Sequence, residues 1–306
     1  MQNLKTLPPI EPNVGSRKKF SKALERISQA FFLRITDDLL GNVVGAGLAQ
    51  DASPKTLAER IIRGARAKQK TGKVVYVRRD LESVSAEIDA IISQNLGEWV
   101  TSLGQAVSEA VKRYARTVLL EVSADQKRAL TVSGFPVQVI DDTWTVPIIR
   151  GRYVSAQAQL QIEKLAQEAT DSICRGYANG IEQVRQVLLE SLEKGQDLRE
   201  LARAISLVDV VRKRRSEFDA IDVSNRFVQS VEMANSMALG IRQGVWIHVP
   251  GAYTSRETHK HFNGKVFDLD KGIYDPDYKG FVRPGELRFC RCIYRQVLPN
   301  WVTKKI

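Results

Sequence analysis

Hydrophobic residues recur every three or four positions along much of the chain, the spacing that marks one buried face of an α-helix. This pattern covers residues 20–39, 84–118 and 162–188, with shorter stretches at 198–205 and 227–241. The run at 84–118 lasts roughly nine turns at 3.6 residues per turn. A helix of this length is typical of an elongated bundle, so we predict a mainly helical body.

Between the second and third helical runs the pattern changes to β-branched residues. Residues 131–149 contain Pro136, Pro147 and the pair Asp141-Asp142. Val137 and Val139, followed by threonines and Ile148, indicate a short hairpin or an extended excursion. Two adjacent aspartates usually mark a turn and not a metal site. We therefore expect a short β excursion near residues 131–149.

After Gly244 the helical period disappears. Residues 244–299 gather glycines, prolines, aromatic residues, all three histidines and two of the three cysteines. We therefore predict four parts: a flexible N-terminal arm at 1–16, an N-terminal helical region at 17–152, a second helical region at 153–243, and a C-terminal domain at 244–306. The predicted fold class is mainly α with a small C-terminal α+β domain, that is, an elongated helical bundle followed by a compact cassette of strands and turns.

The composition narrows the class of protein. Of 306 residues, 43% are hydrophobic and 26% are charged, which is ordinary for a soluble globular protein. No apolar run approaches the length of a bilayer span, so we expect no membrane association. Residues 1–15 contain three prolines and no long apolar stretch, so we expect no secretory signal. Three cysteines fit no disulfide framework and suit a reducing cytoplasm.

The net charge of +11 is concentrated at the two ends of the chain. Residues 1–80 hold 16 lysines and arginines against 7 acidic residues, residues 81–243 hold 19 against 22, and residues 244–306 hold 11 against 6. Basic ends predict contact with a polyanion such as nucleic acid, with a solvated basic surface as the alternative. The candidate phosphate-binding residues form two clusters: Arg60, Arg63, Arg66 and Lys70, and Arg212, Lys213, Arg214 and Arg215.

The C-terminal cassette contains an ordered series of chemically distinctive residues. In a strand, Cys290 and Cys292 would point to the same face, and with His259 or His261 they could hold zinc. Cys-x-Cys is not the usual zinc spacing, so we expect no cofactor and two buried thiols, with zinc on His259, Cys290 and Cys292 as the alternative. The series is Trp246, Arg256, His259, Asn263, Gly264, Pro284, Cys290, Arg291 and Cys292.

Arg256 and His259 also permit a catalytic interpretation. In a helical turn the two would be neighbours and could share a carboxylate such as Asp268 or Asp270. Histidine could then act as a general base in phosphodiester cleavage, while arginine stabilises negative charge. The sequence supplies no clear nucleophile, Gly-rich phosphate loop or paired-carboxylate metal site. We therefore expect a protein that is not an enzyme and has no catalytic residues.

The ordered series resembles the C-terminal domain of the phage Mu F-like minor head protein family. That family has a tryptophan, an arginine with a histidine three residues on, an Asn/Asp-Gly turn, a proline and a Cys-Arg-Cys. The resemblance covers about residues 227–299, including Glu232, Ala234 and Asn235 in the preceding helix. An acidic residue that usually precedes the family's arginine has no counterpart in residues 249–255.

The resemblance implies a head morphogenesis protein of a tailed bacteriophage. Such a protein would be a minor capsid component of few copies, assembled in the host cytoplasm and kept in the capsid interior near the portal. The implied partners are the portal protein and packaged double-stranded DNA, with major capsid or scaffold proteins as further candidates. Two alternatives stay open: a phage nuclease or head-delivered effector that uses the Arg/His cassette, and a nucleic-acid-binding module unrelated to heads.

Overall fold

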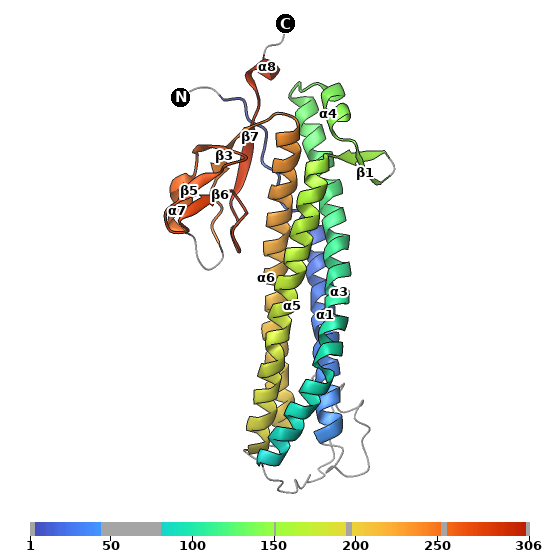
Figure 1. Cartoon of the computed structure of the whole chain (residues 1–306). Helices are drawn as coiled ribbons and strands as arrows, with labels where there is room; N and C mark the ends of the chain where they lie inside the picture. The colour runs from blue at the N-terminus through green and yellow to red at the C-terminus, as the bar shows by residue number, and fades with distance from the viewer. Residues whose placement is uncertain (1–3, 44–80, 150, 194–197, 252–255, 304–306) are drawn as a thin grey trace. The chain divides into compact units, whose positions relative to one another are not determined.

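The computed structural model of the chain describes residues 4–43, 81–149, 151–193, 198–251 and 256–303 (Figure 1). Four long helices, α1 (Val14–Val43), α3 (Leu81–Val132), α5 (Ala156–Glu193) and α6 (Leu198–Ala238), account for most of it. The predicted fold class, mainly α with a small C-terminal α+β part, is confirmed. The chain divides into two units, each with a segment of all four helices.

In the second unit, Ser21–Glu109 with Thr170–Glu217, the described residues form segments of the four long helices. The indole of Trp99 on α3 is buried and donates a hydrogen bond to Asp38 on α1 over 2.7 Å. The hydroxyl of Tyr177 on α5 lies 2.8 Å from that of Ser216 on α6. These buried polar groups find partners across the helices, which fixes the register of one helix against the next.

The first unit combines the remaining helical segments, up to Phe20, at Ala110–Ala169 and from Phe218 onward, with the C-terminal cassette. Phe20 on α1 stacks on Tyr114 of α3 at 4.4 Å, and the Tyr114 hydroxyl donates to Ser224 of α6 over 2.6 Å. Ser155 caps α5, because its hydroxyl accepts from the Ala158 amide over 3.1 Å. The same hydroxyl donates to Asn235 of α6 over 2.8 Å.

The β excursion begins later in the chain than the sequence suggested. The prediction of extended structure at Val137 and Val139 is wrong, because these residues lie in a short helix, α4 (Val137–Thr143), which begins after Pro136. The turn expected at Asp141-Asp142 is also wrong, since both residues lie within α4. The hairpin is β1 (Val146–Ile149) with β2 (Arg152–Val154). Burial of Ile140 and Trp144 on a helical spacing decides the conformation of this segment over the β-branched composition.

Helix α6 is longer than its hydrophobic pattern predicted. The sequence pattern predicts separate helices at 198–205 and 227–241, and the basic residues 212–215 lie between these two stretches. The structure instead shows one continuous helix over 41 residues, and the basic cluster lies in its interior. Basic residues have high helix propensity, so a solvated basic stretch can continue a helix as well as end one.

The C-terminal cassette, residues 243–303, is built from short antiparallel strands with two short helices. A three-stranded sheet has the order β4 (Val266–Asp268), β3 (Gln243–Ile247), β7 (Ile293–Val297), and β5 (Ile273–Asp275) pairs with β6 (Gly280–Val282). Helix α7 (Glu257–Phe262) precedes β4, and α8 (Asn300–Thr303) follows β7.

The described residues near the N-terminus lie along β7. The sequence placed them in a flexible arm, yet the Leu7 amide donates to the Gln296 carbonyl over 3.0 Å, and the Leu298 amide donates to the Lys5 carbonyl over 2.9 Å. Leu7 is buried. These residues therefore add a short antiparallel segment to an otherwise open sheet edge.

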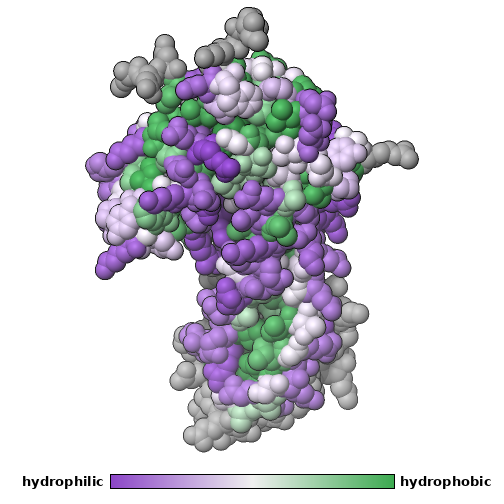
Figure 2. All heavy atoms as spheres, turned by 45° about the horizontal axis from the view of Figure 1, so that its top comes forward, coloured by the Kyte–Doolittle hydropathy of each residue, from purple (hydrophilic) through white to green (hydrophobic). Residues whose placement is uncertain are grey.

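One hydrophobic cluster joins the cassette to the helices of the first unit. Trp246 and Tyr294 of the cassette share it with Leu130 at the end of α3 and with Met233 and Met237 of α6. Figure 2 shows hydrophilic side chains over most of one face, with apolar side chains in smaller patches among them. None of the described helices is apolar enough, over a sufficient length, to span a bilayer.

Candidate functional site

The cassette buries a histidine against two thiols. The Nδ1 atom of His259 lies 3.4 Å from the Cys290 Sγ and 3.7 Å from the Cys292 Sγ. His259 is only 2% exposed, and both cysteines are buried as well. One ligand atom from each residue lies within 4.8 Å of the others, so the three could hold a metal ion. We refer to His259, Cys290 and Cys292 as the His/Cys cluster.

A buried carboxylate lies on the other side of the His259 ring. Oδ2 of Asp275 is 3.3 Å from His259 Nε2, close enough for an ion pair but not aligned as a hydrogen bond. The other carboxylate oxygen, Oδ1, accepts the backbone amide of Asp277 over 3.0 Å. Thr258 donates to Oδ2 over 3.2 Å. The sequence suggested Asp268 or Asp270 for this role, which is wrong: Asp268 instead accepts the Asp270 amide within its own turn.

Helix α6 holds the Cys-Arg-Cys segment in place. The side-chain amide of Asn225 donates to the backbone carbonyls of both Cys290, over 2.8 Å, and Cys292, over 3.3 Å. Asp222 accepts the backbone amide of Phe289, directly before the segment. Burial raises the pKa of Asp222, while that hydrogen bond and nearby arginines oppose the shift. Strand β7 begins after the segment, at Ile293, so the thiols converge through these contacts and not through a sheet.

A second histidine reaches the cluster from the end of β3. Nδ1 of His248 lies 3.6 Å from the Cys292 Sγ, and the His248 amide donates to the Asn263 side chain over 2.9 Å. Asn263 and Gly264 form the predicted turn, but only Gly264 has a positive φ, at 79°. This is the requirement of a type II turn, which glycine meets without strain. The Asn-Gly pair thus positions His248 as well as reversing the chain.

Trp246 lies at the centre of the cassette's aromatic packing. Its ring contacts His259, Phe262 and Phe267 edge-on, with centroids 5.1 to 5.7 Å apart. Its neighbour Gly244 leaves no room for a side chain, because a Cβ there would come within 2.6 Å of the Tyr294 ring. This packing fixes the face of β3 on which the His/Cys cluster is built.

The pKa values of the two thiols are shifted in opposite directions. A hydrogen bond from Cys290 lowers the pKa of Cys292 to about 7, and the Val249 amide, the Trp246 indole and the charge of Arg256 act in the same direction. Burial opposes this shift. The pKa of Cys290 is raised, first by its hydrogen bond to Cys292 and then by burial. The pair therefore favours one thiolate, at Cys292.

The other residues of the predicted series surround this centre. Arg256 is exposed and donates to the Arg288 carbonyl over 3.0 Å, so it does not share a carboxylate with His259. Pro284 is buried in the loop beside α6, and Arg291 is half-buried between the two cysteines. His261, considered with His259 as a zinc ligand, is exposed, and its Nδ1 lies 2.8 Å from the Glu257 carbonyl.

Sequence reasoning missed His248, Asp275 and the α6 residues that hold the cysteines. His248 could have been found, since it lies two residues after Trp246 in a strand and therefore shares its face. The approach of Asp275 to His259 depends on the β5–β6 hairpin, which no local pattern reports. Asn225 likewise meets the cysteines from 65 residues away in the chain.

The predicted basic clusters are only partly described. Arg60, Arg63, Arg66 and Lys70 lie outside the described residues, and so does the side chain of Arg212. Lys213 and Arg214 are exposed on α6, and Lys213 pairs with Glu25 over 3.5 Å. Arg215 is half-buried, with its guanidinium close to Gly176 of α5. The described residues of this cluster therefore do not all present an exposed, unpaired positive charge on one surface.

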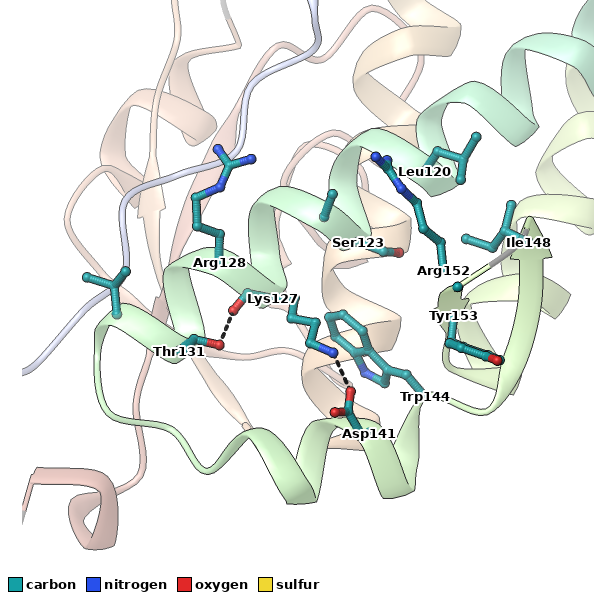
Figure 3. A pocket seen from close by; sticks show the side chains of 13 residues that line it. Leu120, Ser123, Lys127, Arg128, Thr131, Asp141, Trp144, Ile148, Arg152 and Tyr153 are labelled. Carbon is teal, nitrogen blue, oxygen red and sulfur yellow. Dashed lines mark hydrogen bonds and ion pairs between the residues drawn. The ribbon is translucent and has the colours of Figure 1, made fainter.

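A pocket of about 420 Å³ lies between α3 and the α4–hairpin excursion (Figure 3). Trp144, Leu120 and Ile148 give it apolar walls, and Figure 3 shows Lys127 of α3 reaching Asp141 of α4 across one side. Tyr153 lies at its edge and is 50% exposed. The two strands of the hairpin thus present apolar side chains beside a hollow, which is typical of a surface that binds a partner.

Residues 182–295 match the model of the family described as "Phage Mu protein F like protein". No curated protein and no solved structure matches the chain. The match confirms the predicted resemblance, and it includes α6 and the cassette through Arg295. Over residues 182–295, somewhat more than a third of its length, the chain is therefore similar to this family.

Proposed function

We propose that this chain is a minor head protein that acts in capsid assembly without catalysis. The proposal starts from the Mu F-like region at residues 182–295. The family match carries this proposal, since it covers the helix, the strands and the thiols that form the site. Similarity to a family of head morphogenesis proteins implies that the chain contacts other head components. We propose the portal protein as the principal partner. The chain would then reside in the capsid interior beside the portal and packaged DNA.

The burial of His259 supports a non-catalytic role. Its Nδ1 faces two sulfur atoms and its Nε2 faces Asp275, so neither nitrogen is presented to solvent or to a substrate phosphate. A general base must come within hydrogen-bond reach of the proton that it removes. His261 is exposed, and among the described residues it belongs to no group of three potential metal ligands.

We propose that the pocket beside the β1–β2 hairpin contributes to portal binding. Tyr153 exposes apolar surface at its edge, and Arg128 and Arg152 add positive charge around it. This combination suits a partner segment that inserts an apolar side chain flanked by acidic residues. Binding energy at such sites is concentrated in a few large side chains.

Co-expression with the portal protein of the same phage tests this contact. We expect the wild-type chain to co-purify with portal, and Tyr153→Asp to weaken the association roughly tenfold or more because it places a charge in an apolar contact. Tyr278→Asp is the matched control, since Tyr278 is 59% exposed on the β5–β6 hairpin. Equal binding by both variants would contradict the assignment to the pocket, and no binding by wild type would contradict portal association.

DNA contact is proposed for the basic N-terminal cluster. Each phosphate contact contributes about 0.9 to the slope of log affinity against log salt on duplex DNA. Replacing Arg60, Arg63 and Arg66 with alanine is therefore expected to flatten that slope by up to about 2.7. The control removes the same charge from exposed positions of the acidic middle of the chain, Lys112, Arg113 and Arg175.

Binding measured by fluorescence anisotropy over a salt series gives both slopes. An unchanged slope in the triple-arginine variant, or an equal change in the control, would remove the cluster from the account of DNA binding. The same mixtures report on the alternative function: metal-dependent cleavage that is lost in His259→Ala would favour a nuclease over an assembly protein.

A further inference from the structure

Three side chains of the cassette, His259, Cys290 and Cys292, are spaced as ligands of one tetrahedral metal ion would be, and a fourth, His248, lies beside Cys292. With Zn–S bonds of about 2.3 Å and Zn–N bonds of about 2.0 Å, a tetrahedral site separates sulfur from nitrogen by about 3.5 Å. The three S···N distances here are 3.4 Å, 3.7 Å and 3.6 Å, for Cys290–His259, Cys292–His259 and Cys292–His248. His248 is near Cys292 only, and it lies outside the group whose ligand atoms are all within 4.8 Å of one another.

The surroundings of His259 orient the ring for metal binding through Nδ1. Asp275 is fully buried beside Nε2, at 3.3 Å, so a proton on Nε2 is favoured and the Nδ1 lone pair faces the sulfurs. In metal-bound histidines the ring nitrogen that does not bind the metal usually faces a carboxylate or a backbone carbonyl. Asp275 is itself held by the amides of its own turn and by Thr258.

Charge balance also agrees with a divalent ion. Two thiolates and two neutral imidazoles around Zn²⁺ form a neutral unit, which avoids the cost of burying an unpaired charge. The contending arrangement is a metal-free network in which the Cys290 thiol donates to the Cys292 thiolate and the two histidine rings lie beside the sulfur atoms.

We propose that the cassette binds one structural Zn²⁺ through Cys290, Cys292 and His259, with His248 as the fourth ligand. Four protein ligands close the coordination sphere, so the ion would stabilise the fold and would not activate water. The zinc ion would link the end of β3, helix α7 and the Cys-Arg-Cys segment through their side chains. This inference is independent of the proposed head function, because a metal-free cassette could still bind portal or DNA.

Metal analysis of the purified full-length chain tests the site directly. We expect about one zinc per chain to remain after dialysis, and Cys290→Ser and His259→Ala to lose it. Cys174→Ser is the matched control, since Cys174 lies on α5 in the other unit and should leave the zinc content unchanged. Asp275→Asn keeps every ligand and is expected to weaken zinc binding by about 10- to 100-fold.

Cobalt titration of the chelator-treated wild-type chain gives a readout that does not require the ligand variants to fold. One equivalent of Co²⁺ is expected to produce thiolate-to-cobalt absorption in the near ultraviolet and the visible bands of a tetrahedral site. His248→Ala should weaken cobalt binding less than His259→Ala does. Wild-type protein that purifies without zinc and shows no thiolate–cobalt absorption would overturn the proposal in favour of hydrogen-bonded thiols.

Discussion

Replacing Trp246 with alanine is expected to lower the free energy of unfolding by about 3–5 kcal/mol, the range for removing a large aromatic side chain from a core. Trp246 is 0% exposed, and its ring contacts His259, Phe262 and Phe267. The cavity would open inside the cluster that joins the cassette to α3 and α6. Guanidinium denaturation followed by circular dichroism measures the loss.

Trp301→Ala provides the matched control for this prediction. Trp301 is 53% exposed and packs against Phe135 at 5.1 Å, so its removal creates no buried cavity and should cost much less than the change at Trp246. Equal losses in the two variants would contradict a cassette built around Trp246. A loss confined to zinc content, with unfolding unchanged, would contradict it as well.

Replacing Glu232 with glutamine is expected to remove a pH dependence of stability. Glu232 on α6 is fully buried, and burial raises its pKa from 4.5 to about 8, against the opposing hydrogen bond that Gln296 of β7 donates over 2.7 Å. Tyr294 also faces this carboxyl, and burial, followed by the charge of Glu232, raises its pKa well above the usual value. The carboxyl is therefore neutral in the folded protein near pH 7.

The sign of the effect follows from the raised pKa. Between pH 4.5 and about 8 the folded protein holds a proton that the unfolded chain releases. The free energy of unfolding therefore falls as the pH rises through this window, by at most about 1.4 kcal/mol per pH unit. Below pH 4.5 and above about 8 the contribution to the slope disappears, because both states then carry the same protonation.

Denaturation at several pH values between 5 and 8 measures this slope. Glu232→Gln should flatten it, because the amide cannot titrate, whereas Glu217→Gln should retain the wild-type slope. Glu217 is a suitable control because it is an exposed glutamate on the same helix. Identical slopes in wild type and Glu232→Gln would show that the buried carboxyl does not titrate in this range.

The helical body could be predicted because its signal is local and repeated. Apolar positions at helical spacing marked α1, α3 and α5 over many turns, and the loss of that spacing after Gly244 marked the beginning of the strand-rich part. The errors arose where composition and burial disagree. Val137 and Val139 favour a strand by composition, but Ile140 and Trp144 fix a helix through packing against the rest of the unit.

The order of residues in the cassette predicted the family that it resembles but not its internal geometry. The sequence singled out Trp246, His259, Cys290 and Cys292, and the structure places these four together. It did not single out Asp275, because a carboxylate in a Tyr-Asp-Pro-Asp turn looks like a turn residue until the hairpin brings it to the His259 ring. The choice between buried thiols and a metal ligand set depends on distances that no spacing in the sequence provides.

Helix α6 also holds parts of the cassette in place through its side chains. Asn225 and Asp222 hold the cysteine segment, and Glu232 holds β7, so one face of this helix positions two parts of the cassette. The family match begins within α5 and includes all of α6, which agrees with the helix and the cassette forming one structural element.

Quantitative mass spectrometry of purified phage heads, taken both before and after DNA packaging, tests the proposed role most directly. A minor head protein predicts this chain in both preparations, at few copies per particle and in a fixed ratio to portal. Its absence from both preparations, while portal and capsid proteins are detected, would contradict the assignment to the phage head.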